Sequence, residues 1–156
     1  MIVLVLAVFS LGGCSAPTEI QLDARFRPLV RVREASAPGL RPGQVMTLYT
    51  DVVTADLADL TSAYRPGSVE WDALMLHERQ HSIREFEDPS FLARYAASRG
   101  FRWQEEKIGW SAEIAHLRVH GRFVDVAWIA ETLSRDYGGM VGLEDARAWA
   151  EGELAR

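Results

Sequence analysis

The chain has 156 residues and a mass of 17.5 kDa, which is the size of one domain. Apolar residues make up 48% of it and include five Trp, so the chain can build a proper hydrophobic core. The net charge of −5 and the isoelectric point near 5.4 argue against a nucleic-acid partner, because phosphate binding requires a basic surface.

The first residues carry the pattern of an export signal. Residues 2–11 form an apolar run that is too short for a membrane-spanning helix, which needs about 20 residues, but suits the hydrophobic region of a signal peptide. The following Leu11-Gly12-Gly13-Cys14 resembles a bacterial lipobox, in which the cysteine becomes the lipidated first residue of the mature protein. No Lys or Arg precedes the apolar run, so a plain signal peptide, or a start a few codons upstream, is the alternative.

Cys14 is the only cysteine, so no disulfide can form within the chain. We therefore expect residues 1–14 to be a signal peptide with a lipobox, Cys14 to be the lipidation site, and residues 15–25 to be a tether. These features predict a protein of the bacterial cell envelope that a lipid anchors to a membrane. The anchor would lie in the outer membrane, facing the periplasm, or at the cell surface.

Beyond the tether, the early part of the chain favours strands. Apolar residues alternate in part from Phe26 to Val32, which predicts a strand, and residues 35–43 hold two Pro and two Gly and predict a loop. Residues 44–53 are rich in Val, Thr and Tyr and predict one strand or a bent hairpin arm. A short helix is expected over residues 56–64.

The later part of the chain favours helices. We expect them over residues 69–85, 91–98, 102–119, 125–134 and 143–154. Ser68, Asp88 and Asp125 are suitable N-caps, while Gly100, Gly121 and Gly138-Gly139 are suitable ends. Strands come early and helices late, so the predicted fold class is α+β. A small N-terminal β-sheet is followed by a mainly helical half, in a single domain over residues 26–156.

The most informative run is His77-Glu78-Arg79-Gln80-His81, an HExxH motif inside the helix expected over residues 69–85. Residues i and i+4 of a helix lie on one face with Cβ atoms roughly 5–6 Å apart, so both imidazoles can reach one zinc ion. Glu78 is turned by about 100° from His77 and can instead act as general base on a zinc-activated water. The alternative is two surface histidines beside an ordinary glutamate. The apolar residues 71–76 disfavour it, because they indicate a half-buried helix.

A catalytic zinc usually takes a third protein ligand. Glu87 occupies the position of the third histidine of metzincins, and no second cysteine exists, so the ligand must be another His, Glu or Asp. The helix expected over residues 102–119 carries Glu105, Glu106 and Glu113. Glu106 and Glu113 share a face but lie about 10.5 Å apart along the axis, and Glu105 points about 100° away, so only one of the three can bind the ion.

The run Glu106-Lys107-Ile108-Gly109-Trp110, on a helix after HExxH, resembles the Glu-x-x-Ala-Tyr/Asp segment of gluzincin metallopeptidases. The chain is also similar, roughly over residues 44–149, to small bacterial minimal gluzincin domains. The resemblance implies a zincin-like fold, a Zn²⁺ site made by His77, His81 and Glu106, and close packing of the two helices at Gly109. Trp110 departs from the pattern, since Asp or Tyr is usual at its position.

Three further side chains are candidates for the site. Glu113 and His120 share the Glu106 face and could be an alternative metal ligand or a support for the ligands. His116 and His120 are four residues apart, which permits a second metal site, although a solvated helix end explains the pair more simply. Tyr137 could donate a hydrogen bond to the oxyanion of a tetrahedral intermediate, or could be a core tyrosine.

These features predict a zinc-dependent metallopeptidase or amidase at the bacterial envelope, which takes a peptide or protein substrate and uses Glu78 as the general base. The strand region over residues 44–53 is the candidate for holding an extended substrate backbone. Two alternatives remain open. One is a catalytically inactive binding module that zinc stabilises, and the other is an envelope lipoprotein that binds no metal.

Overall fold

The computed structural model describes residues 18–36, 40, 44–137 and 139–156. The expected signal peptide over residues 1–14, its lipidation site Cys14 and the helix-breaking Gly138 lie outside the described residues. Within the described part of the chain, no helix is both long and apolar enough to cross a membrane. The fold class is α+β, as predicted, because a small four-stranded sheet comes first and a mostly helical half follows.

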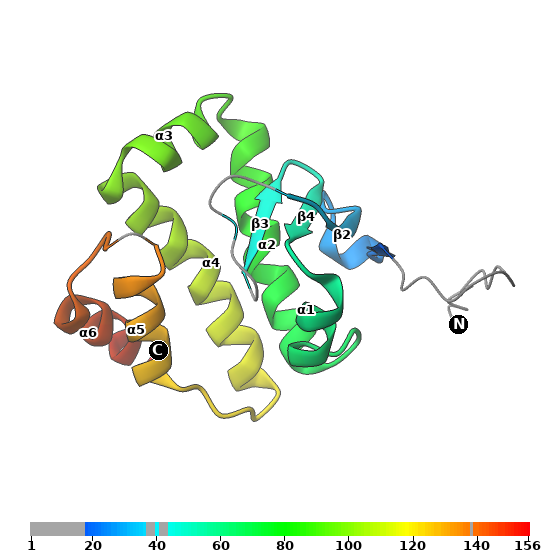
Figure 1. Cartoon of the computed structure of the whole chain (residues 1–156). Coiled ribbons are helices and arrows are strands. Elements are labelled where there is room, and N and C mark those ends of the chain that lie inside the picture. Colours follow the sequence, from blue (N-terminus) through cyan, green and yellow to red (C-terminus); the bar gives the residue numbers. More distant parts are fainter. Residues whose placement is uncertain (1–17, 37–39, 41–43, 138) are drawn as a thin grey trace, which may run out of the picture.

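The sheet is mixed, with the strand order β1-β2-β4-β3. Its strands are β1 (Glu19–Gln21), β2 (Arg31–Glu34), β3 (Val45–Leu48) and β4 (Asp51–Thr54). The β1–β2 and β3–β4 pairs are antiparallel, and β2 and β4 are parallel. β1 and β3 are therefore the two edges of the sheet, and β3 is the edge that lies beside helix α2 (Figure 1).

Two predictions about the start of the sheet are wrong. Phe26 to Val32 is not one strand, because residues 24–26 form a 3-10 helix and β2 begins only at Arg31. Pro28 cannot donate to a strand ladder, and the turn around it buries Phe26 and Leu29 in the core. The expected tether over residues 15–25 is also too long, since β1 pairs with β2 and belongs to the sheet.

Residues 44–53 form most of a complete hairpin rather than a single strand. β3 and β4 are joined by Tyr49 and Thr50, and Tyr49 has a φ of 54°. A positive φ at this point matches the twist of a two-residue hairpin turn. The turn therefore places Tyr49 at the end of β3, next to the last turns of α2.

The described helices wrap one side of the sheet and extend away from it. They are α1 (Leu57–Ala63), α2 (Val69–Glu87), α3 (Phe91–Ala97), α4 (Arg99–Val119), α5 (Val126–Arg135) and α6 (Leu143–Leu154). Figure 1 shows α4 between α2, which lies against the sheet, and the α5–α6 pair on the other side. The long helix pair α2–α4 therefore joins the sheet to the rest of the chain.

Several helix boundaries follow the predicted caps. Ser68 and Asp125 are the N-caps of α2 and α5, as predicted. Their side chains accept hydrogen bonds from Trp71 N and Trp128 N. Gly121, with a φ of 66°, follows the end of α4.

Asp88 and Gly100 do not have the predicted roles. Asp88 ends α2, and its carboxylate accepts hydrogen bonds from the backbone N and Oγ of Ser90, so α3 begins only at Phe91. Gly100 lies inside the first turn of α4 and closes no helix, because Ser98 both ends α3 and caps α4.

Two separate hydrophobic cores hold the described residues together. The sheet core consists of Phe26, Leu29, Val32, Val52, Leu57, Leu60, Trp71, Leu74 and Met75. The helical core consists of Trp110, Ile114, Val124, Ile129, Ala130, Leu133, Met140, Ala146 and Ala150. α2 contributes to the first and α4 to the second, so the middle of the α2–α4 interface belongs to neither core.

Candidate metal centre

The middle of the α2–α4 interface holds two histidines and a glutamate. His77 and His81 point from α2 toward Glu106 on α4, with His77 Nε2 3.5 Å from Glu106 Oε2 and His81 Nε2 3.3 Å from Glu106 Oε1. All three side chains are buried. One ligand atom of each lies within 4.8 Å of the other two, so the group could hold a metal ion.

Gly109 allows α4 to approach α2 this closely. A Cβ atom at this position would lie 2.4 Å from Cδ2 and 2.5 Å from Nε2 of His77, which is inside any normal contact distance. The imidazole of His77 therefore occupies the space of the missing side chain. The two helices are therefore closely packed at Gly109.

The outer nitrogen of His77 contacts a second carboxylate on α4. Nδ1 of His77 lies 3.0 Å from Glu113 Oε2 and Nε2 faces Glu106; with the proton on Nδ1, the N–H donates to Glu113 and the Nε2 lone pair would be available to a metal ion. The ring of Trp110 packs edge-on against His77, with ring centroids 5.2 Å apart. At the position where gluzincins carry Asp or Tyr, this chain thus has an aromatic contact, and the carboxylate contact comes from the next turn.

The electrostatics of the group fit a bound cation. Burial raises the pKa of Glu106, but the charge and hydrogen bonds of His81 and His77 outweigh it and lower that pKa well below its ordinary range. Burial lowers the pKa of His77, but the interactions of the imidazole with the carboxylates of Glu106 and Glu113 outweigh burial, so that the pKa is raised overall. Glu106 Oε2 and His81 Nδ1 are buried without hydrogen-bond partners. A buried carboxylate with an unsatisfied oxygen is costly, and a cation between it and the imidazoles would offset that cost.

Glu78 lies beside the group, on the side of the sheet. The hydroxyl of Thr47 on β3 donates to Glu78 Oε2 at 2.6 Å and also lies 3.2 Å from the Glu78 carbonyl oxygen. Both side chains are buried. Thr47 therefore fixes the orientation of the Glu78 carboxylate and ties the edge strand to the middle of α2.

Two tyrosines approach Glu106 from the helical half. The hydroxyl of Tyr95 at the end of α3 donates to Glu106 Oε1, and Tyr137 after α5 also interacts with this carboxylate. Burial and the negative charge of Glu106 raise the pKa of both phenols far above the ordinary value, so both remain protonated donors. Arg102 holds the two segments in place, since its guanidinium donates to the carbonyl oxygens of Tyr95 and Tyr137 at 3.0 and 2.7 Å.

The other candidates from the sequence have different surroundings. Glu105 forms an ion pair with Arg84 at 3.2 Å and does not face the histidines. His120 caps the C-terminal end of α4, about 21 Å along the axis from Glu106, so it does not support the site. The rings of His116 and His120 lie 4.2 Å apart, but among the described residues no further Asp, Glu or Cys completes a three-ligand group with them.

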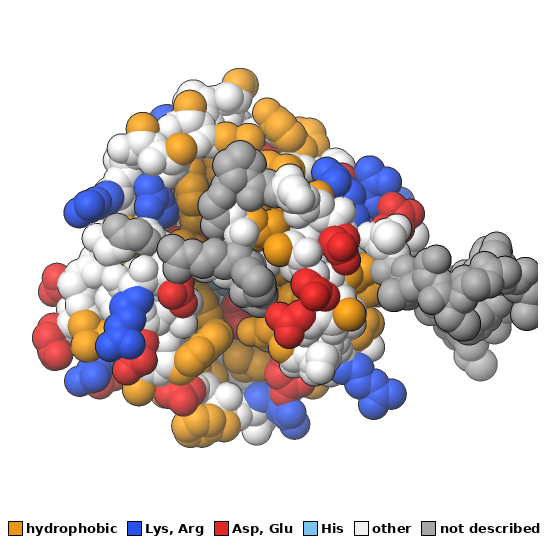
Figure 2. Space-filling view, viewed as in Figure 1, with side chains coloured by type: hydrophobic (Ala, Val, Ile, Leu, Met, Phe, Trp, Pro, Cys, Tyr) orange, Lys and Arg blue, Asp and Glu red, His pale blue; other side chains and the backbone are white. Residues whose placement is uncertain are grey.

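A pocket of about 680 Å³ opens onto these side chains. Its walls are mostly apolar and come from β3, α1, α2, α3, α4 and α5, while its polar lining includes His77, Glu78, His81, Glu106 and Tyr137. Figure 2 shows a hollow on this face that is bordered largely by hydrophobic side chains. The candidate metal ligands are therefore buried from bulk solvent yet meet a space large enough for a ligand.

The comparisons with known proteins add no relative. No protein-family model matches the chain, and no curated protein or solved structure is significantly similar to it. The functional reading of the site therefore depends on its own residues and geometry.

Sequence reasoning did not identify four of the residues around the site, namely Thr47, Glu85, Tyr95 and Arg102. Each of them reaches the site, or a residue beside it, through a contact between separate elements, and neither Thr47 nor Tyr95 belongs to a spaced motif. Glu85 had a signal that could have been used, since it continues the i, i+4 series from His77 and His81 along α2.

Proposed function

We propose that this chain is a zinc-dependent metallopeptidase. The observation that carries the proposal is the buried group of His77, His81 and Glu106, with Glu78 beside it, at the wall of an open pocket. Two imidazoles and one carboxylate are a donor set of catalytic zinc sites, in which the fourth position stays open to water and substrate. A bound zinc ion would acidify a water molecule and polarise the scissile carbonyl group.

In this proposal Glu78 is the general base. Thr47 holds Oε2 of the carboxylate by its hydrogen bond, so Oε1 is the oxygen that accepts a proton from the attacking water. The same carboxyl group then passes the proton to the nitrogen of the leaving amine. Glu113 keeps His77 in the tautomer that presents a lone pair to the metal, through its contact with Nδ1.

Tyr95 and Tyr137 are the candidates for stabilising negative charge on the carbonyl oxygen. Both phenols lie at Glu106 and line the pocket, and their raised pKa values keep them in the donating form. Each phenol has one proton, and that of Tyr95 is donated to Glu106 Oε1, so its hydroxyl would have to turn from Glu106 to the oxyanion in order to stabilise it. The sequence pointed to Tyr137 alone, and the structure adds Tyr95.

The edge strand β3 is the proposed support for the substrate backbone. Among the described strands β3 pairs with β4 alone, so one side of its backbone is not used by that sheet, and residues 44–47 line the pocket. An extended peptide can add to such an edge by main-chain hydrogen bonds. Thr47 then connects this edge directly to Glu78.

The proposal is tested with the Glu78→Gln variant. We expect wild-type protein loaded with one equivalent of zinc to cleave members of a peptide library, and Glu78→Gln to keep the zinc while turnover falls by about 10²- to 10⁴-fold. His81→Ala should lose the metal itself. If Glu78→Gln keeps both metal and full activity, or if zinc-loaded wild type cleaves no peptide, the enzyme proposal fails. In the second case the zinc-stabilised binding module becomes the better explanation.

We also propose that the protein acts at the bacterial envelope, anchored by lipid on Cys14. The lipobox-like run before Cys14 supports this location. Growth of a bacterial host that expresses the chain with a labelled fatty acid should label the wild type and not Cys14→Ser. Equal labelling of the two proteins would contradict the anchor and leave the metal site unaffected.

A further inference from the structure

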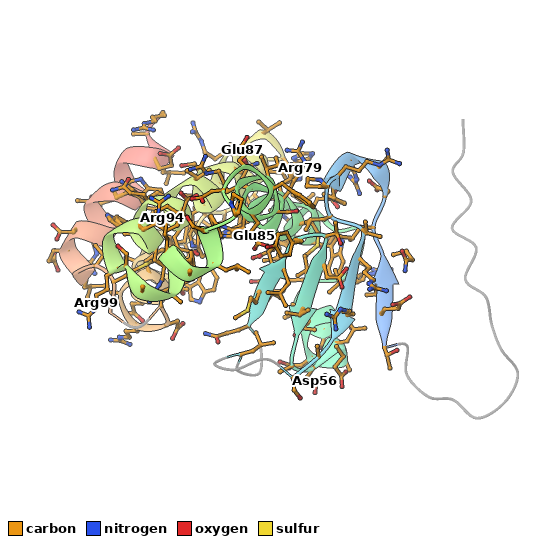
Figure 3. The ribbon with its side chains drawn as sticks, turned by 90° about the horizontal axis from the view of Figure 1, so that it is seen from above. Asp56, Arg79, Glu85, Glu87, Arg94 and Arg99 are labelled. Carbon is orange, nitrogen blue, oxygen red and sulfur yellow. The ribbon has the colours of Figure 1, made fainter. Side chains whose placement is uncertain are left out.

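Glu85 is a buried carboxylate of the pocket that the proposed reaction does not use. It lies on α2 one turn beyond His81, and Figure 3 places it on the side of the helix that faces the strands. Oε2 accepts a hydrogen bond from the backbone N–H of Tyr49 at 2.5 Å. Oε1 is buried without a partner, and only 2% of the residue is exposed.

No Lys or Arg of the described chain forms an ion pair with Glu85; the charge of His81 lowers its pKa and that of Glu78 raises it. Its neighbour Arg84 points to the other side of α2, where it pairs with Glu105 and Glu87. The basic residue among the described side chains that line the pocket is Arg102, and its guanidinium already donates to three backbone carbonyl oxygens, those of Tyr95, Ala96 and Tyr137. A buried carboxylate with one unpartnered oxygen and no Lys or Arg beside it is costly, so the site favours a ligand that brings a positive charge.

The whole pocket is electrically suited to such a ligand. Four buried carboxylates line it, namely Glu78, Glu85, Glu106 and Glu113. A bound divalent ion would balance two of their negative charges and leave two. Burial raises the pKa of Glu85 to about 6, against the opposing effect of the Tyr49 N–H, and a nearby positive charge would bring it back toward its ordinary value.

We infer that Glu85 binds a positively charged group of the substrate, an ammonium or a guanidinium, in the pocket beside the metal centre. The inference rests on the proposed function for the nature of the substrate, a peptide. His81 and Glu85 are separated by about 6 Å along the helix axis, so the cation lies next to the reacting carbonyl rather than on the metal. The α-ammonium of a peptide N-terminus and the side chain of Arg or Lys are the two sources of this chemistry.

The test measures binding rather than turnover, so that it is independent of catalysis. Zinc-loaded protein is titrated by calorimetry with three amides that differ in the presence, the position and the chemical group of a positive charge. Leucine amide carries an α-ammonium, N-acetyl-arginine amide carries a side-chain guanidinium, and N-acetyl-leucine amide is neutral. We expect at least one cationic amide to bind about tenfold more tightly than the neutral one, which corresponds to about 1.4 kcal/mol.

Three variants assign the preference to Glu85. Glu85→Gln should remove it, because the amide keeps the bond to Tyr49 N–H but has no charge. Glu85→Asp should retain part of it, which keeps the test valid if the Gln variant does not fold. Asp136→Asn is the matched control, since Asp136 is an exposed carboxylate of the same pocket and its loss should leave the preference unchanged.

The outcomes separate the inference from the proposed function. Preference for leucine amide alone identifies the N-terminal amine as the ligand, and preference for the arginine derivative alone identifies a basic side chain. If the preference follows Glu85 but no peptide is cleaved, the cation site stands and the catalytic proposal fails. Equal binding of all three amides by wild type overturns the inference. So does an equal effect of Asp136→Asn, or a loss of zinc rather than of the preference in Glu85→Gln.

Discussion

The two halves of the molecule contribute different chemistry to the same site. We call the sheet together with α1 and α2 the sheet half, and α3 to α6 the helical half. The sheet half supplies both histidines and the general-base candidate Glu78 from α2, and the hydroxyl of Thr47 from β3. The helical half supplies Glu106, the third candidate ligand, and the carboxylate of Glu113, with two tyrosines around them. Each half has its own hydrophobic core, but neither holds three metal ligands.

The two halves are joined by polar groups as well as by hydrophobic packing. The contact between them is the α2–α4 pair, whose middle is filled by buried imidazoles and carboxylates instead of apolar side chains. Burying such groups costs free energy unless a counter-charge compensates them. A metal ion would therefore connect two halves that hydrophobic packing alone holds less firmly, and most of the predictions below test that connection.

The largest expected effect is that of the metal itself. At a free zinc concentration about 1,000 times its Kd, binding should stabilise the folded protein by about 4 kcal/mol and raise the melting temperature by on the order of 10 °C. Thermal unfolding with zinc and with a chelator measures the difference. The His116→Ala/His120→Ala double variant should keep the shift and His81→Ala should lose it. An equal shift in His81→Ala would place the metal elsewhere.

Gly109→Ala tests the close approach of the two halves. The added Cβ would lie 2.4 Å from the His77 ring, so the ring or the helix must move, and we expect zinc affinity to fall by about 100-fold. Gly100→Ala in the same helix is the control, because a Cβ there meets nothing within 4 Å. That variant should keep its zinc and gain up to about 1 kcal/mol of stability. Full zinc affinity in Gly109→Ala would contradict the described packing.

Glu113→Gln tests a contact that crosses between the halves. The neutral amide is a weaker partner for His77 Nδ1, so zinc affinity should fall by about 10- to 100-fold while the fold remains. Competition with a chromophoric chelator measures the affinity. Glu105→Gln removes a neighbouring buried carboxylate that pairs with Arg84, and its zinc affinity should equal that of wild type. A similar loss in both variants would argue for a general charge effect.

Glu85, on the side of α2 that faces the sheet, should make the stability of the folded protein depend on pH. Burial raises the pKa of Glu85 to about 6, above its unfolded value, so the folded state binds the extra proton between these values. Stability should therefore fall as pH rises from about 4.5 to about 6, by at most about 2 kcal/mol. Glu85→Gln should be the more stable protein at pH 7 and lose this advantage at pH 4, in denaturant unfolding at fixed zinc. A constant difference across that range would contradict the raised pKa.

The smallest effect is expected inside the sheet half, at Thr47. Thr47→Val keeps the shape of the side chain but removes the hydrogen bond that orients Glu78. If the chain is a peptidase, kcat should fall by about tenfold with zinc content unchanged, since a hydrogen bond to a charged carboxylate contributes about 1.5 kcal/mol or more. Thr61→Val, on α1, is the matched control, because its hydroxyl bonds only to the carbonyl oxygens of Leu57 and Ala58. A loss of zinc in Thr47→Val would show that the residue supports the metal site instead.

The sequence by itself determined the features that depend on local spacing. The early strands, the late helices, the caps Ser68 and Asp125 and the shared face of His77 and His81 all follow from patterns within a few residues. Prediction from local rules was wrong where two neighbouring residues could both precede the same helix. Asp88 was expected to cap α3, but Ser90 stands directly before its first residue. From the residues alone, Glu105, Glu106 and Glu113 remained open as the third ligand.

The tertiary structure distinguishes those carboxylates, because their surroundings depend on which face of α4 lies against α2. Gly109 sets that face, and it directs Glu106 to both histidines, Glu113 to the outer nitrogen of His77 and Glu105 to Arg84. The contact of Thr47 with Glu78 spans 31 positions and that of Tyr49 with Glu85 spans 36. No periodicity links residues so far apart in sequence, so only the packing of the hairpin on α2 reveals them.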